Sequence, residues 1–133
     1  MPVLDATCLI DMRRHPARME PILRRAVEME EDLLVPIQAA IEFAAGEKDP
    51  EAAMAALASD FTLAELDEPI ARVAARIAKA AMRKGRFPGW ADVQVAATAI
   101  HEGMLILTRN PRHVGEALGA RVWNYAEDDE PPE

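Results

Sequence analysis

The chain has few of the features that form disulfides or attach a protein to a membrane. Its 133 residues include one cysteine, Cys8, which excludes an internal disulfide framework. No apolar run approaches the roughly 20 residues of a membrane-spanning helix. Asp5 and Asp11 interrupt the N-terminal apolar stretch that a signal peptide would need. We therefore expect a cytoplasmic protein without a membrane segment, in which Cys8 is a small buried apolar group.

Positive charge is also in short supply, because the formal net charge is −8 at pH 7. Many of the acids lie in the Pro-containing segment 127–133, which we expect to be a disordered tail, and residues 1–126 are expected to form one domain. An acidic protein is a poor non-specific binder of nucleic acid, although a bound metal would reverse the local sign. The basic residues clustered in 13–25 and 72–86 are expected on solvated helix faces.

What the chain does contain is an alternation of short apolar runs and longer helical patterns. Pro21 either kinks its helix or marks the true start, and Asp49 and Asp67 are expected helix caps. The alternation predicts an α/β fold with a mainly parallel sheet of about five strands and helices on both faces, a three-layer arrangement. The expected strands are 2–4, 33–35, 61–66, 104–108 and 120–123, and the expected helices are 6–12, 16–31, 36–46, 50–59, 68–84, 90–101 and a short one from 110.

A few polar side chains stand where such a sheet would gather them. Asp5 ends the first apolar run and Asn110 closes the fourth, and ligands bind beyond the carboxyl ends of parallel strands. Asp92 lies in the first turn of a helix that precedes the fourth strand. Glu42 reaches the same edge only if its helix leans over it. Buried acids without matching cations indicate a divalent metal, and a metal suggests phosphate chemistry.

Each of these residues also has a simpler explanation. Asp5 and Asn110 can each cap the helix that follows, and Asp92 can be a first-turn acid that complements the helix dipole. Glu42 can be a solvated residue, and Thr7 a turn hydroxyl. In the same way Thr108 can be an ordinary strand residue and Arg109 a surface arginine. The three histidines are scattered without ligand spacing and receive no role.

Three segments together resemble the PIN domains. They are residues 3–11 (VLDATCLID), 91–99 (ADVQVAATA) and 107–113 (LTRNPRH), which look like the opening of that family, its third acid with an alanine-rich helix, and its closing Thr-Arg-Asp/Asn segment. Each segment is a weak signal alone, and their order, with Glu42 between the first two, strengthens the match. The resemblance covers about residues 1–125 and is greatest to the VapC-type toxins of bacterial toxin–antitoxin pairs.

That resemblance implies a Mg²⁺- or Mn²⁺-dependent endoribonuclease with a PIN-like three-layer fold. It implies that Asp5, Glu42 and Asp92 bind metal, that Asn110 takes the fourth acidic position, and that Thr7 assists near the reacting phosphate. It further implies a homodimer and a small antitoxin whose tail enters the acidic groove. Two departures stand out: Asn110 is neutral where many relatives carry Asp, and His113 stands where many have an acid.

The mechanism expected on this basis is attack by a metal-activated water. Asp5 and Asp92 would hold a first ion with Asn110 beside it, and Glu42 with Asp5 a second ion when RNA arrives. Cleavage would leave a 5′-phosphate and a 3′-hydroxyl, and Arg109 or Arg112 would neutralise a flanking phosphate. The dimer interface is expected on apolar residues of 52–57 and 70–82.

Three other classes compete with this interpretation. A signalling receiver domain needs an early acid pair and a late Lys, which Leu4-Asp5 and the fourth strand do not supply. A haloacid-dehalogenase-type phosphatase needs Asp-x-Asp, and Asp5-Ala6-Thr7 lacks the second acid. A PIN-like binding module with weak or no catalysis, engaging RNA or an antitoxin, remains the open alternative.

Overall fold

The chain folds around a central sheet of five short strands, in a computed structural model that describes residues 2–29 and 32–132. Every predicted strand and helix is present, with ends displaced by a few residues, and the predicted α/β class is confirmed. None of the helices within these ranges is long and apolar enough to cross a membrane. The elements are β1 (Val3–Leu4), α1 (Ala6–Arg14), α2 (Pro16–Met29), β2 (Leu34–Pro36), α3 (Ile37–Ala45), α4 (Pro50–Asp60), β3 (Thr62–Ala64), α5 (Glu68–Arg83), α6 (Trp90–Glu102), β4 (Ile106–Thr108), η1 (Arg112–Glu116, a π-helical turn) and β5 (Val122–Asn124).

All neighbouring strands of the sheet run parallel, in the order β3-β2-β1-β4-β5. Val3 pairs with Leu34 on one side and with Ile106 on the other, so β1 is the central strand. The three inner strands β2, β1 and β4 are buried throughout. Buried, continuously apolar strands are what a parallel sheet covered on both faces requires.

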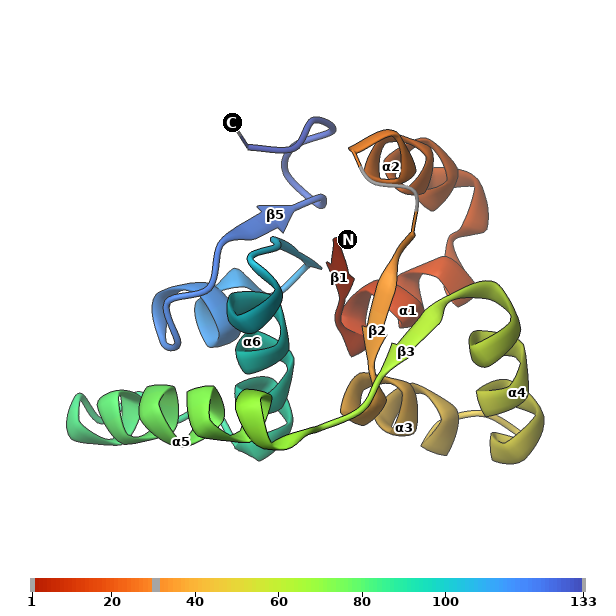
Figure 1. Ribbon diagram of the computed structural model, residues 1–133. Helices are drawn as coiled ribbons and strands as arrows, with labels where there is room; N and C mark the ends of the chain where they lie inside the picture. Colours follow the sequence, from red (N-terminus) through yellow and green to blue (C-terminus); the bar gives the residue numbers. More distant parts are fainter. Residues whose placement is uncertain (1, 30–31, 133) are drawn as a thin grey trace.

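The chain crosses the sheet in two opposite directions, and β1 and β4 are the neighbouring strands from which these two halves start. From β1 it moves outward through β2 to β3, then returns past β1 to β4 and β5. Right-handed connections therefore put α1 to α4 on one face and α5 and α6 on the other. In Figure 1, α5 and α6 lie to the left of β1, β2 and β3, whereas α1 and α4 lie to the right, α3 below and α2 above. The switch point beside β1 and β4 is where open parallel sheets bind ligands.

Several helix boundaries follow directly from single residues. The side chain of Asp49 accepts a hydrogen bond from the backbone N–H of Ala52 at 3.1 Å, and the side chain of Asp67 accepts one from Ile70 at 2.9 Å. Both aspartates are therefore helix caps, as the sequence predicted. Gly103 ends α6 in the left-handed conformation with φ of 69°, which favours glycine. Pro21 lies inside α2, which begins five residues earlier, at Pro16, so it does not mark the helix start. Residues 30 and 31 of the predicted helix lie outside the described residues.

The segment after β4 departs from its sequence pattern. Pro111 occupies the capping position of η1, and the side chain of Asn110 makes no capping hydrogen bond, so the expectation that it caps a helix is wrong. Gly115 lies in this turn, and a Cβ there would stand 3.2 Å from the side chain of Val122. The π-helical turn is therefore packed tightly against the start of β5. This packing leaves the side chain of Asn110 available for the site.

The C-terminal segment lies against the body of the protein through a few polar contacts. The indole N–H of Trp123 donates to the backbone oxygen of Asp128 at 2.8 Å. Glu130 pairs with Arg25 of α2, with the two charged groups 2.7 Å apart. Both partners of this ion pair are exposed, so its contribution to stability is small.

Candidate active site

Asp5 is the most enclosed acid of the candidate site. It directly follows β1 and caps α1, where Oδ1 accepts from the backbone N–H of Cys8 at 3.0 Å and from the hydroxyl of Thr7 at 2.6 Å. Its residue surface is only 6% exposed. Burial raises the pKa of Asp5 above its ordinary value, against the opposing effect of hydrogen bonds from Thr108 and Thr7. Asp5 is thus both a helix cap and a buried carboxylate at the sheet edge.

Thr108 joins the end of β4 to this carboxylate. Its hydroxyl donates to Oδ2 of Asp5 at 2.5 Å and accepts from the backbone N–H of Asn110 at 2.9 Å. Thr108 is completely buried, and a buried hydroxyl requires such partners. The sequence favoured an ordinary strand residue here. The signal that could have identified it is a single hydroxyl at the end of an otherwise apolar strand.

Asp92 reaches the same edge from the opposite layer. It lies in the first turn of α6, with its side chain 32% exposed, and Oδ2 is 3.1 Å from Nδ1 of His113. The same ring nitrogen is 3.1 Å from Nδ2 of Asn110. Burial raises the pKa of Asp92, and the nearby His113 lowers it. A continuous series of contacts therefore runs from Asp5 through Thr108, Asn110 and His113 to Asp92.

Glu42 belongs to the same electrostatic neighbourhood, although it lies on the exposed side of α3. Partial burial raises the pKa of Glu42, and repulsion by Asp92 and Asp5 raises it further. Repulsion by Asp92 also contributes to the raised pKa of Asp5. The three carboxylates are close enough to repel one another, which the sequence alone did not establish for Glu42.

The sequence predicted no role for His113 at this edge, although the resemblance placed it where many PIN toxins have an acid. It received no role because the three histidines have no ligand spacing along the chain. In the structure, η1 turns its ring toward both Asn110 and Asp92. The available signal was the spacing of three between Asn110 and His113 across Pro111, which places both side chains in one turn.

Arg109 does not face the acids as a free cation. Its Nε lies 3.0 Å from Oδ2 of Asp11, a buried acid of α1 that also accepts from the hydroxyl of Tyr125 at 2.5 Å. Burial and the adjacent acid raise the pKa of Tyr125 far above its ordinary value. Of the two arginines expected to contact a phosphate, Arg109 is therefore already paired with Asp11.

A recess of about 300 Å³ adjoins His113. Arg86 and Arg112 place two exposed guanidinium groups on it, and neither has an ion-pair partner among residues 2–29 and 32–132. Phe87 lines the recess and packs edge-on against the exposed ring of Trp90, with the ring centroids 5.0 Å apart. Glu116 also lines the recess, which therefore combines two arginines and one glutamate with aromatic surface beside the acids of the site.

The donors at this edge suit a hard divalent cation. Asp5, Asp92 and Glu42 offer carboxylate oxygens and Asn110 an amide oxygen, the ligand types that Mg²⁺ and Mn²⁺ prefer. Asp5 and Glu42 have no ion-pair partner in the described part of the chain, which leaves their charge for a metal. Within that part, however, no three His, Cys, Asp or Glu side chains are already drawn together around one point. The donor set fits a metal, and the side chains must close around it.

The comparisons with known proteins agree with this architecture. The family model of the PIN domain matches residues 3–115, so the chain belongs to the PIN domain family. No curated protein matches the chain.

Solved structures with the same fold come from toxin–antitoxin complexes. VapBC-1 from nontypeable Haemophilus influenzae is similar with a TM-score of 0.76 and 17% identity, over 93% of this chain and 97% of that one. DNA-bound VapBC from Salmonella typhimurium gives a TM-score of 0.73 and 23% identity, over 92% and 98%. A toxin–antitoxin complex from Klebsiella pneumoniae has a TM-score of 0.69 and 19% identity, over 92% of this chain and 96% of that one. At these identities the likeness establishes the shared fold.

Proposed function

We propose that this protein is a Mg²⁺- or Mn²⁺-dependent endoribonuclease, the toxin of a VapBC-type toxin–antitoxin pair. The observation that carries the proposal is the connection of Asp5 to Asp92 through Thr108, Asn110 and His113 at the switch point of the sheet. PIN domains are generally nucleases, and the structural relatives are toxin–antitoxin proteins. Carboxylates that lie close together with raised pKa values are the groups such chemistry uses, and two of these three, Asp5 and Glu42, have no ion-pair partner in the described chain.

Each residue at this edge of the sheet would have a separate role in metal binding and RNA cleavage. Asp5, Asp92 and Glu42 would hold the metal, with Asn110 in the fourth position. The bound metal would supply a Lewis acid that lowers the pKa of a water and offsets charge on the phosphate. Thr108 and Thr7 fix the carboxylate of Asp5 by their hydrogen bonds, and we keep Thr7 as the helper next to the phosphate.

RNA would approach from the recess beside His113. Arg86 and Arg112 offer charge to the phosphate backbone, and the Phe87–Trp90 pair offers a face for an unstacked base. This local basic surface answers the objection that a chain of net charge −8 repels nucleic acid. The substrate class we propose is single-stranded RNA or an RNA loop.

The test is RNA cleavage with Mg²⁺, Mn²⁺ or EDTA, followed on a mixed panel of transfer, ribosomal and messenger RNA. Asp5→Asn and Asp92→Asn should lose metal-dependent cleavage by about a thousand-fold or more, a loss of roughly 4 kcal/mol in transition-state stabilisation. Asp60→Asn, at the exposed end of α4, is the matched control and should cleave as the wild type does. Circular dichroism checks that each variant is folded. Wild-type rates in Asp5→Asn would overturn the assignment.

The alternative function is a PIN-like module that binds RNA or an antitoxin without cutting. Two observations favour it: Asn110 is neutral, and the acids are not drawn together around one point in the described residues. The same experiment separates the two functions. RNA binding that EDTA leaves intact, with no cleavage in either metal, would identify the binding module.

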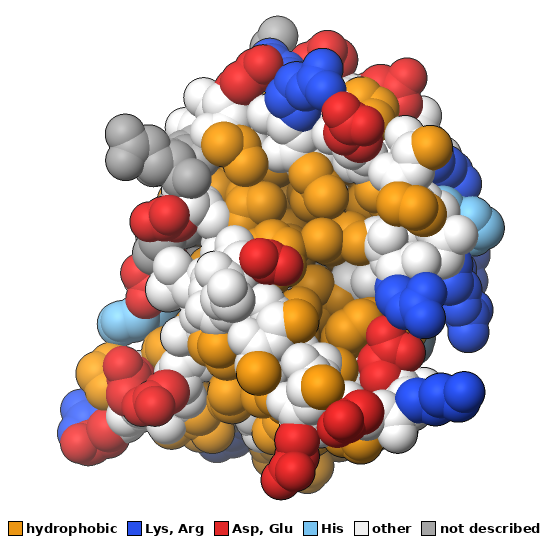
Figure 2. All heavy atoms as spheres, turned by 90° about the vertical axis from the view of Figure 1, so that its right-hand side faces the viewer, with side chains coloured by type: hydrophobic (Ala, Val, Ile, Leu, Met, Phe, Trp, Pro, Cys, Tyr) orange, Lys and Arg blue, Asp and Glu red, His pale blue; other side chains and the backbone are white. Residues whose placement is uncertain are grey.

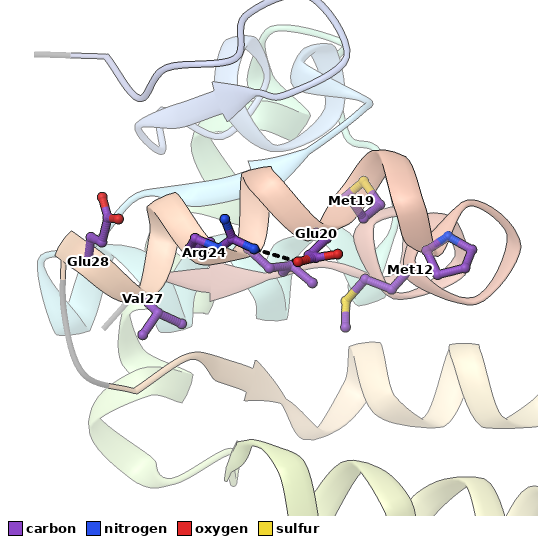
Figure 3. A pocket seen from close by; sticks show the side chains of 8 residues that line it. Met12, Met19, Glu20, Arg24, Val27 and Glu28 are labelled. Atoms are coloured by element: carbon purple, nitrogen blue, oxygen red, sulfur yellow. Dashed lines mark hydrogen bonds and ion pairs between the residues drawn. The ribbon is translucent and has the colours of Figure 1, made fainter.

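The antitoxin has a candidate docking surface on the face that carries α2. A recess of about 620 Å³ is lined mainly by apolar side chains of α1 and α2, among them Met12, Met19 and Val27. Figure 2 shows the hollow in which these apolar groups gather, bordered by acidic and basic side chains. Figure 3 shows Val27 projecting from the side of α2 that faces β2, and Met12 of α1 lining the same recess, while Glu20 and Arg24 pair with each other on α2. We propose that an apolar segment of the antitoxin occupies this recess and that its tail continues to the acidic groove.

The homodimer that we propose uses a different surface. Exposed apolar side chains on α4 and α5 include Met82, which is 49% exposed, and the alanine-rich outer face of α4. Neither α4 nor α5 contributes a lining residue to the α2 recess, so we propose that the two surfaces are separate. Sedimentation of the wild type and of Met82→Glu tests this, because the charge should shift the protein toward the monomer.

A further inference from the structure

One ring nitrogen of His113 has two neighbours that cannot both bond to it. Nδ1 lies 3.1 Å from Oδ2 of Asp92 and 3.1 Å from Nδ2 of Asn110. An ionised carboxylate only accepts hydrogen bonds, an amide nitrogen only donates, and one imidazole nitrogen of neutral histidine does one or the other. Whichever tautomer is present, one of the two contacts is repulsive.

Rotation of the Asn110 amide by half a turn removes the repulsive contact with His113, but it leaves three electron-rich atoms facing one another. The amide then presents Oδ1 in place of Nδ2, so that a carboxylate oxygen, an amide oxygen and a ring nitrogen meet at one point. A positive group must fill that point, and the two possible occupants are a proton on Nδ1 and a metal ion. A neutral imidazole that carries its proton on Nδ1 brings no net charge to an edge where Asp5 and Glu42 have no ion-pair partner in the described chain.

The spacing of these atoms fits a metal ion. Two adjacent ligands of an octahedral ion, each about 2.1 Å from it and at right angles, lie about 3 Å apart. The distance from Nδ1 to the Asp92 oxygen and the distance from Nδ1 to the Asn110 amide are both 3.1 Å. His113, Asp92 and the turned Asn110 can therefore serve as neighbouring ligands of one ion with little movement of the side chains.

We propose that His113 is itself a metal ligand through Nδ1, and that it makes this site prefer a first-row transition dication to Mg²⁺. Imidazole nitrogen binds first-row transition ions well, whereas Mg²⁺ favours oxygen ligands and retains its waters. The inference rests on the proposed function, because it adds a ligand to the metal site described there. It also gives Asn110 its role, as the neutral third donor beside the imidazole.

The decisive measurement is pulsed electron paramagnetic resonance on untagged protein loaded with Mn²⁺ at about pH 8, because protons compete with a metal ion for its ligands. The chain has only three histidines, so a ¹⁴N coupling to the ion can be traced to one of them. The coupling should appear in the wild type and disappear in His113→Gln. His101→Gln is the matched control, because His101 is an exposed residue of the last turn of α6, about 13 Å along the helix from Asp92. That variant should retain the coupling.

Titration calorimetry gives the second readout, the ratio of the Mg²⁺ dissociation constant to the Mn²⁺ dissociation constant. Replacing the imidazole by an oxygen ligand in His113→Asp should lower this ratio by about ten-fold. His101→Gln should leave it unchanged. Thermal unfolding confirms that both variants retain the wild-type fold.

Each outcome is decisive. Mn²⁺ binding without a nitrogen coupling in the wild type, or with a coupling that survives in His113→Gln, overturns the role of His113 and leaves the proposed nuclease intact. Tighter binding of both ions to His113→Gln would show that His113 carries a competing proton instead. Failure of the wild type to bind either ion would overturn this inference together with the metal dependence on which it rests.

Discussion

The hydroxyl of Thr108, at the end of β4, donates a hydrogen bond to Oδ2 of Asp5, at the start of α1, over a distance of 2.5 Å. The two residues are 103 positions apart in the chain and meet at the ends of adjacent strands, because Leu4, just before Asp5, pairs with Leu107, just before Thr108. This bond fixes the carboxylate at the edge of the sheet. It also lowers the pKa of Asp5, opposing the larger effect of burial.

Removal of that hydroxyl should therefore destabilise the protein. Thr108→Val keeps the shape of the side chain but leaves a buried carboxylate oxygen without its donor, at a cost of about 1–3 kcal/mol in the free energy of unfolding. Urea denaturation measures this cost. Thr98→Val is the control, because the hydroxyl of Thr98 only returns to the backbone oxygen of Gln94 within α6. If both variants lost the same free energy of unfolding, the hydrogen bond to Asp5 would contribute no more to stability than the bond within α6.

The metal-free protein should become more stable as the pH falls from about 7 toward 5. Asp5, Asp92 and Glu42 have a raised pKa in the folded state, so the folded protein holds more protons than the unfolded chain above their ordinary values of 3.8 for Asp and 4.5 for Glu. Stability contributed by such groups is present at low pH and is lost as the pH rises through the folded pKa.

Thermal unfolding in EDTA at a series of pH values tests this sign. Asp5→Asn should flatten the profile, because it removes the most enclosed of the three acids, and Asp60→Asn should leave it unchanged. Adding Mg²⁺ or Mn²⁺ should restore stability near neutral pH, since an ion that binds the folded state alone stabilises it. The prediction would be contradicted if the midpoint temperature of unfolding without metal rose steadily as the pH was raised from about 5 to about 7.

Val27→Glu should weaken antitoxin binding without changing RNA cleavage. Val27 is 45% exposed on the apolar recess of α2, and a carboxylate there would have to be desolvated on docking. Binding is measured by calorimetry with the proposed antitoxin. Leu66→Glu provides a control of equal exposure outside that recess, since Leu66 is also 45% exposed. Similar losses in the two variants would place the antitoxin elsewhere.

Arg112→Gln should raise KM for RNA more than it lowers kcat. Arg112 lines the recess next to His113, so we expect it to hold a flanking phosphate rather than the reacting one. Loss of one phosphate contact should lower the slope of binding against salt concentration by about one. Arg121→Gln, at an exposed arginine just before β5, is the control and should keep the wild-type slope. If Arg112→Gln kept the wild-type dependence of RNA binding on salt concentration, RNA would not bind in this recess.

The fold was largely predictable because its signals are local. Caps such as Asp49 and Asp67, and the helix end at Gly103, act through bonds and dihedral angles within a few residues. The exceptions arose where packing across the sheet competes with local preference. Asn110 before Pro111 has a good capping sequence, yet the close approach of Gly115 to Val122 accompanies a π-helical turn that does not use it.

The candidate site was only partly predictable. Asp5 and Asp92 could be placed because each adjoins the end of a regular element, and the edge of a parallel sheet collects such positions. Glu42 could not be placed, since the tilt of α3 is set by packing. His113 and the pairing of Arg109 with Asp11 were missed because they depend on contacts between segments far apart in the chain.

The sequence by itself determined the order of strands and helices, the apolar layers and the presence of acids at strand ends, because periodicity and capping operate over a few residues. Tertiary structure decided which of those acids repel one another, which hydroxyl holds Asp5, and that the ring of His113 stands beside Asp92. The physical reason is that electrostatic and hydrogen-bond interactions depend on distances of a few ångströms, and only the packed chain sets those distances.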